Sequence, residues 1–171
     1  MKPTTKDAYD KLILNLEDQV KIYRSLLEVV RKEKDILISA NLDDLTENNK
    51  AKEAMLLKLR GLESSRIRYV AELAVSEGMP TESPRLVDLA IHFGGEVEDR
   101  LRNLHSVLEL LLKRVQEYNQ QNEGLVNSAL EKITGAMNAI RDTLTEKPTY
   151  EKKGQMADQG AQSGQLVSRE A

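Results

Sequence analysis

The chain has 171 residues, with 25 basic and 28 acidic side chains and a formal net charge of −3. The two signs are mixed along the whole sequence, which excludes the basic face expected of a nucleic-acid-binding protein. Hydrophobic residues make up 40% of the chain and aromatic residues 4%. Long narrow seams are therefore easier to bury than a deep pocket, which argues against an enzyme. There is no cysteine, and the apolar runs are too short for a membrane span or a signal peptide. We therefore expect a soluble, intracellular protein that does not insert into membranes.

Two helices are predicted in the first half of the chain. Ala, Glu, Lys, Leu and Arg supply 81 of the 171 residues, a share typical of long or coiled helices. Residues 5–38 carry a seam with steps of four and three, the repeat of a coiled coil. The seam comprises Tyr9, Ile13, Leu16, Val20, Tyr23, Leu27, Val30, Lys34 and Leu37. Asn41 is placed to cap a second helix over residues 42–76, and the short connection predicts an antiparallel hairpin. The apolar positions of the second helix are Leu42, Leu45, Met55, Leu56, Leu59, Leu62, Tyr69, Val70 and Leu73.

A proline-containing segment, residues 77–84, separates the hairpin from two further helices. Ser83 followed by Pro84 predicts the N-cap and first position of a short helix, which Gly94 and Gly95 end. A long helix is then predicted over residues 96–144. Its seam comprises Val97, Leu101, Leu104, Leu108, Leu111, Val115, Tyr118, Asn122, Leu125, Ala129, Ile133, Met137, Ile140 and Leu144.

The predicted fold is therefore all-α, since no segment alternates with the period of a strand. We expect an elongated antiparallel helical hairpin plus a long C-terminal helix, packed as a coiled-coil-like bundle. The predicted domain covers residues 1–145. Residues 146–171 have few aliphatic side chains to offset the entropy of ordering, so they are predicted to be a flexible, disordered tail.

Polar residues interrupt the long helix at positions 119–124, and Asn122 falls on the seam itself. Before the interruption the seam is rich in leucine, and we expect it to pair with the hairpin. After it, the apolar face becomes smaller and softer, with Ala129 and Met137 among its members. This second half is expected to lack a fixed partner within the chain, although folding back on the hairpin as ordinary core is the alternative.

The sequence offers little catalytic chemistry. His92 and His105 have no partner at metal-ligand spacing, and we expect both to be partly buried surface residues. A histidine phosphotransfer bundle is the alternative for His92, but the Lys-Gly pair that follows the histidine in such proteins is absent. Acidic pairs such as Asp43 and Asp44 suit the first turn of a helix without any catalytic role. We predict no catalytic residue, cofactor or metal.

Four stretches resemble the FlgN family of flagellar export chaperones. Residues 26–45 and 50–63 match helices that many Leu- and Glu-rich proteins share. Residues 115–126 contain Asn119 and Asn122, similar to the family's Asn-x-x-Asn followed by an apolar run. Residues 148–154 contain Thr149, Tyr150 and Gly154, similar to its Thr-Tyr and Gly after the final helix. The resemblance covers nearly the whole chain to Gly154, and the extension after Gln155 has no counterpart in it.

The resemblance implies a cytoplasmic chaperone that binds the C-terminal helical segments of hook-associated proteins of the FlgK and FlgL type. Such chaperones keep their clients from assembling and pass them to the flagellar type III export apparatus. Tyr150 is the candidate for docking on that apparatus. The candidate client-binding residues are Leu125, Val126, Ala129, Ile133, Met137, Ile140 and Leu144.

A structural coiled-coil adaptor or tether without a client is the rival interpretation, because leucine heptads are most often structural. The sequence leaves open which clients are bound and whether the chain is a monomer or a homodimer without them.

Overall fold

The computed structural model describes residues 3–79 and 84–145, and the regular structure within these ranges is entirely helical. The helices are α1 (Pro3–Ser39), α2 (Leu42–Ser76), α3 (Leu86–Phe93) and α4 (Gly95–Thr145). The predicted all-α class is confirmed. The chain divides into two compact units, with the boundary between Ser128 and Ala129 within α4. The first unit contains α1, α2, α3 and most of α4, and the described part of the second is the last segment of α4.

Local signals set the ends of the helices. The Oδ1 atom of Asn41 accepts hydrogen bonds from the backbone N–H groups of Asp43 and Asp44 at 3.1 and 3.2 Å, which confirms the predicted cap of α2. Gly94 ends α3 with a φ of 65°, a backbone conformation that glycine adopts without steric penalty.

The predicted start of the third helix is wrong. The N-cap is Arg85, and Pro84 lies before the helix rather than in its first turn. The backbone N–H of Arg85 donates to Oδ2 of Asp88 at 3.0 Å, so a carboxylate inside the helix fixes where α3 begins. Ser83 lies outside the described residues.

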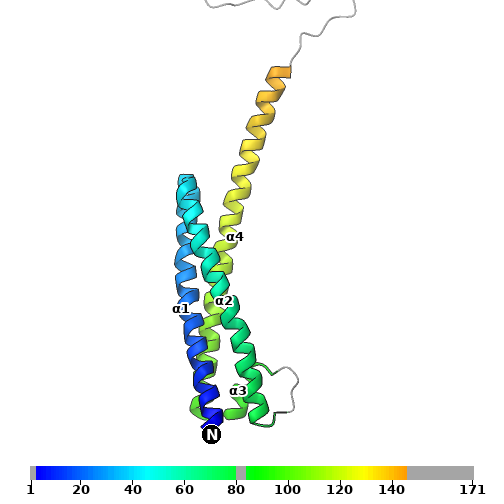
Figure 1. The fold of residues 1–171 in the computed structure, drawn as a ribbon. Coiled ribbons are helices and arrows are strands. Elements are labelled where there is room, and N and C mark those ends of the chain that lie inside the picture. The colour runs from blue at the N-terminus through cyan, green and yellow to red at the C-terminus, as the bar shows by residue number, and fades with distance from the viewer. Residues whose placement is uncertain (1–2, 80–83, 146–171) are drawn as a thin grey trace, which may run out of the picture. The chain divides into compact units, whose positions relative to one another are not determined.

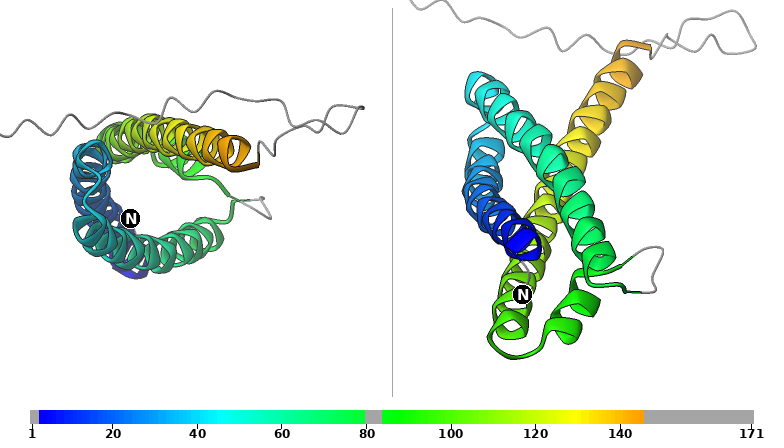
Figure 2. Two further views of the ribbon diagram at one scale, coloured as in Figure 1. Left: turned by 90° about the horizontal axis from the view of Figure 1, so that it is seen from above. Right: turned by 60° about the horizontal axis from the view of Figure 1, so that its bottom comes forward.

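Helix α1 contacts both α2 and α4 within the first unit (Figures 1 and 2). Two apolar clusters follow one another along it. The cluster nearer its start contains buried residues of all four helices: Leu12, Ile13, Leu16, Val70, Leu73, Ala74, Leu86, Leu89, Ala90 and Leu101. The other joins three helices through Leu26, Leu27, Val30, Leu59 and Val115. The expected pairing of the first half of α4 with the hairpin is thus confirmed.

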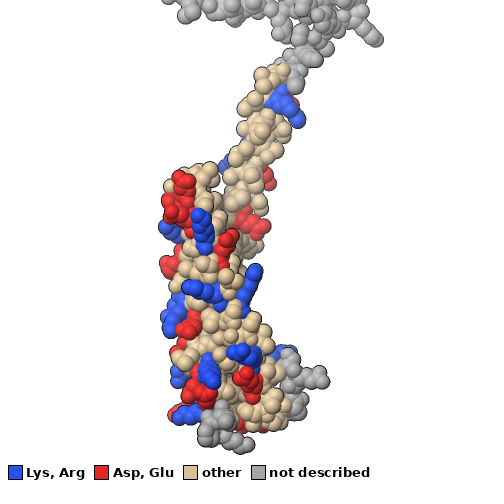
Figure 3. All heavy atoms as spheres, in the orientation of Figure 1, with Lys and Arg blue, Asp and Glu red and all other residues tan. Residues whose placement is uncertain are grey.

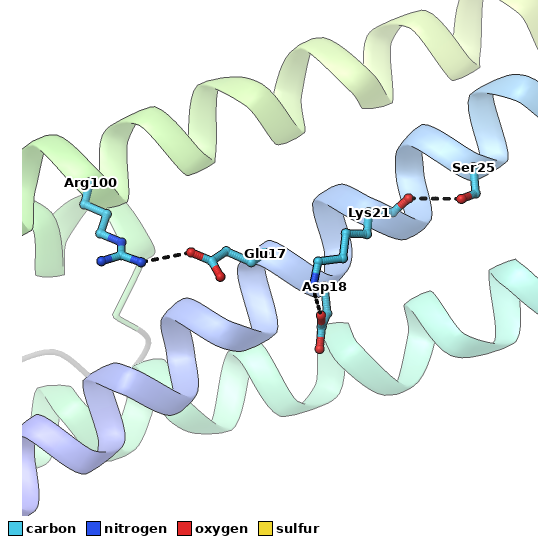
Figure 4. A network of polar contacts seen from close by, with 5 residues as sticks. All are labelled: Glu17, Asp18, Lys21, Ser25 and Arg100. Carbon is cyan, nitrogen blue, oxygen red and sulfur yellow. Dashed lines mark hydrogen bonds and ion pairs between the residues drawn. The ribbon is translucent and has the colours of Figure 1, made fainter.

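Two of the polar side chains that α1 buries, Asn15 and Gln19, are hydrogen-bonded. Asn15 donates to the carbonyl oxygen of Leu62 on α2 at 3.1 Å and accepts from Gln19 at 2.8 Å. Near the surface, Arg100 of α4 donates to Glu17 of α1 at 2.9 Å (Figure 4). Helix α1 is therefore linked to one neighbour by a buried amide and to the other by an exposed ion pair.

The predicted seams agree with burial over most of the first unit. No predicted seam residue of α1 is exposed. The prediction for α2 is wrong at two positions, because Leu42 and Leu56 are exposed. Leu42 is the first residue of α2 and lies just after the hairpin turn, where no preceding turn of helix can cover it.

Candidate protein-binding face of helix α4

Five large apolar side chains lie on one face of the last segment of α4 and are exposed. We call this set the C-terminal stripe: Leu130, Ile133, Met137, Ile140 and Leu144. Their exposed fractions lie between 56% and 79%. Scattered apolar residues are normal on protein surfaces, but a contiguous apolar row marks an interaction site.

The stripe contains four of the seven residues predicted to bind a partner, and the other three adjoin it. Ala129 is exposed beside it. Leu125 and Val126 belong to the last turns of the first unit, where Leu125 is half-buried and Val126 is exposed. The sequence-based prediction did not include Leu130. It counted in steps of four from Leu125 to Ala129 and then to Ile133, and Leu130 is not on that row. The signal was present, since steps of four and three beginning at Val126 include Leu130.

Few charged residues accompany the stripe. Between Ala129 and Thr145 the charged residues are Glu131, Lys132, Arg141 and Asp142. Arg141 and Asp142 are both exposed, with their charged atoms 3.8 Å apart. On the face shown in Figure 3, this segment presents mostly uncharged atoms, whereas acidic and basic side chains are scattered over the first unit. The stripe itself therefore offers apolar contact, and the few charges of this segment lie outside it.

A buried polar cluster lies near the end of the first unit, at the predicted seam residue Asn122. Asn122 is 4% exposed and donates to the carbonyl oxygen of Val30 at 2.9 Å and to Oε2 of Glu33 at 3.1 Å. Both oxygens of Glu33 accept from Nζ of Lys52 at 2.7 Å. The cluster therefore joins α1, α2 and α4, and it fixes the register of α4 against α1.

The register of α4 against α1 places the end of α1 near the end of the first unit. Helix α1 ends at Ser39, less than two turns after Glu33. The α4 residues that follow Asn122 by the same distance are those at the unit boundary, Ser128 and Ala129. Sequence reasoning found Asn122 but missed Glu33 and Lys52, since single charged residues on a helix are usually solvated.

The described residues bring together no catalytic or metal-binding constellation. In the ranges 3–79 and 84–145, no group of three or more His, Cys, Asp or Glu residues could hold a metal ion. His92 is exposed, 3.9 Å from Glu77, and His105 is half-buried, 3.5 Å from Glu109. None of the described helices is long and apolar enough to cross a membrane. The predicted docking residue Tyr150 and the predicted tail lie outside the described residues.

A cavity of about 250 Å³ lies among the helices of the first unit. It is lined by Gln19 and Tyr23 of α1, Arg66 of α2 and Leu108 of α4, among others. The Arg66 guanidinium donates to Glu63 beside the cavity, and this hydrogen bond lowers the pKa of the Glu63 carboxyl. Glu63 itself lines the cavity, together with His105 and Glu109 of α4.

Comparison with known proteins gives a single result. No curated protein and no solved structure matches the chain. The model of the FlgN protein family matches residues 1–158, a range that includes the four helices, the C-terminal stripe and the segment around Tyr150. This match covers nearly the whole chain. The chain therefore belongs to the FlgN family.

Proposed function

We propose that this chain is a cytoplasmic flagellar export chaperone for hook-associated proteins of the FlgK and FlgL type. It binds their C-terminal helical segments, prevents their premature assembly and delivers them to the export apparatus. Family membership implies the export-chaperone role. The observation that carries the choice of site is the exposed C-terminal stripe.

The stripe suits recognition of an amphipathic helix. Its members recur at helical spacing along one face, so a client helix can lie along several of them at once. Met137 adds a flexible, polarisable side chain that adapts to different partners. The proposed client-binding set keeps the residues predicted from the sequence and adds Leu130: Leu125, Val126, Ala129, Leu130, Ile133, Met137, Ile140 and Leu144.

Substitution of Ile133 tests this assignment. Ile133→Asp puts a charge in the middle of the stripe, where a bound client would have to desolvate it. We expect client affinity to fall at least tenfold, about 1.4 kcal/mol, in titrations with the C-terminal segment of a FlgK-type protein. The circular dichroism spectrum should stay nearly native, because Ile133 is exposed in the free chain.

Two further variants make the result specific. Asn138→Asp places the same charge on the other side of the helix and should leave client affinity unchanged. Leu108→Asp charges a residue that packs against the larger apolar cluster, and it should unfold much of the first unit. If Ile133→Asp and Asn138→Asp bind equally well, the stripe is not the client site.

Tyr150 carries the second part of the proposal, docking on the export apparatus. The support is the resemblance of residues 148–154 to the family's Thr-Tyr and Gly pattern. Tyrosine suits such a role because it offers both an apolar ring and a hydrogen-bonding hydroxyl. Tyr150→Ala should reduce secretion of clients while client binding and thermal stability stay unchanged. A loss of stability would instead assign Tyr150 to the fold.

A structural coiled-coil protein without a client is the second candidate. The observation that supports it is the spacing of the stripe. Steps of four and three are those of a coiled-coil seam, which a second copy of the chain could cover. Sedimentation equilibrium of the purified chain separates the two. A chaperone binds the client segment, whereas a tether only self-associates.

A further inference from the structure

The apolar face of the last segment of α4 is wider than its five large side chains alone. At about 100° per residue around the helix, Leu130 and Met137 lie on one side of Ile133, about 40–60° away. Ala129 and Ala136 lie about 40–60° away on the other side, and both are exposed. We call these pairs the Leu shoulder and the Ala shoulder. Together they widen the face to about 120°.

This width is typical of a helix that has two neighbours. A helix in a two-stranded coiled coil uses two apolar positions in seven, whereas a bundle helix adds a third beside them. Here the third position is the residue before each first core position: it is alanine before Leu130 and before Met137, and Thr143 before Leu144. Alanine at that position lets a second helix approach closely without a steric conflict.

The choice of large side chains points in the same direction. In heptad terms Leu130, Met137 and Leu144 occupy the first core position, and Ile133 and Ile140 occupy the second. Unbranched or γ-branched residues at the first position with isoleucine at the second favour assemblies of more than two helices. Both the width and the branching are therefore unsuited to a single partner helix.

We propose that a client covers this face with two adjacent amphipathic helices, one packed on the Leu shoulder and one on the Ala shoulder. The inference rests on the proposed function and specifies the form of client that the stripe takes. It also has an energetic basis. A lone helix that matches the roughly 22 Å from Leu130 to Leu144 is marginal in water and must be ordered on binding. Two client helices already packed together lose less entropy.

The charges beside the face favour a client over a second copy of this chain. Lys132 borders the Ala shoulder and Arg141 borders the Leu shoulder, whereas Glu131 and Asp142 lie near the opposite side of the helix. The contact of Arg141 with Asp142 is solvent-exposed, and exposed ion pairs are weak enough to exchange. Two copies would bring basic edges together. A client with acidic residues along the edges of its apolar face is complementary.

Substitutions on the two shoulders test the proposal with the full chain and a full-length FlgK-type protein from the same organism as the probe. Leu130→Gln and Ala136→Gln should each weaken binding at least fivefold. Asn138→Gln, on the far side of the helix, is the matched control and should bind within twofold of the unmodified chain. Glutamine is a good helix former, and all three positions are exposed, so the helix should persist in circular dichroism.

The outcomes separate this inference from the proposed function. If only one shoulder variant weakens binding, or neither does, while Ile133→Asp still does, a single helix binds and the two-helix inference is wrong. If Ile133→Asp also binds normally, the client site itself is wrong. Self-association of the client-free chain that Leu130→Gln abolishes would assign the face to a second copy.

Cross-linking provides a second readout, because the chain has no cysteine of its own. A photo-cross-linker attached through Leu130→Cys and, separately, through Ala136→Cys should label two different helical segments of the client in mass spectrometry. Labelling of one and the same segment from both positions would overturn the inference.

Discussion

Lys52→Met tests the buried polar cluster that fixes α4 against the hairpin. Nζ of Lys52 lies 2.7 Å from both oxygens of Glu33, and the two side chains are 24% and 10% exposed. The substitution leaves a nearly buried carboxylate with only the Asn122 amide as a donor. Removing one partner of a fully buried pair costs about 3–5 kcal/mol. Because water reaches Lys52 in part, we expect a loss of about 2–3 kcal/mol in the free energy of unfolding.

Urea denaturation followed by circular dichroism measures this loss, and two variants interpret it. The double variant Glu33→Met with Lys52→Met leaves no unpaired charge, so its stability should return to within about 1 kcal/mol of the unmodified chain. Asn122 keeps its hydrogen bond to Val30 in that variant.

The control is Lys21→Met, which breaks an exposed pair with Asp18 (Figure 4). It should change the free energy of unfolding by less than about 1 kcal/mol. If Lys52→Met is as mild as this control, or if the double variant is as unstable as the single one, the cluster is an ordinary solvated ion pair and does not hold α4 against the hairpin.

Three further predictions concern packing, helix stability and pH. Leu101→Ala removes a fully buried side chain and should lower the free energy of unfolding by about 2–5 kcal/mol, while Leu110→Ala, at an exposed position, should change it little; equal losses would contradict the assigned core. A Cβ added at Gly135 has no atom within 4 Å, so Gly135→Ala should stabilise α4 by about 1 kcal/mol and raise the helical signal in circular dichroism. A lower helical signal would reveal a contact at that position. Arg66 lowers the pKa of Glu63 in the folded state, so the stability it confers is present at neutral pH and lost as the pH falls through that lowered pKa. Arg66→Gln should therefore flatten the dependence of melting temperature on pH below about 5, and an unchanged slope would show that the pair adds nothing.

The helices were predictable because their signals are local. A repeat of four and three, an Asn41 cap and the glycines at 94 and 95 each act within a few residues, so the sequence carries them in full. The start of α3 failed for a related reason. Ser83 and Pro84 are a local signal for a helix that starts at Pro84. Asp88 accepts a hydrogen bond from the backbone N–H of Arg85, and this second local signal sets the observed start of α3.

Burial of polar residues was not predictable, because it depends on partners that are distant in sequence. The heptad assigned one seam to α1, but a second row is buried beside it: Leu12, Asn15, Gln19, Leu26 and Glu33. Asn15 is buried because the Leu62 carbonyl, 47 residues away, accepts its hydrogen bond. Glu33 is buried because Lys52 and Asn122 supply donors from two other helices. A polar residue on a helix does not reveal such partners.

The same limit separates the two halves of α4. Both halves carry apolar residues at steps of four and three. This pattern indicates only that one face of the helix is apolar and suited to packing against a partner. In the first unit the hairpin is that partner, and the buried Asn122 cluster sets which α4 residues lie beside the last turns of α1. In the second unit the side chains of the stripe are exposed. The pattern of α4 alone therefore does not distinguish a buried seam from an exposed one, because burial depends on contacts with residues that are distant in sequence.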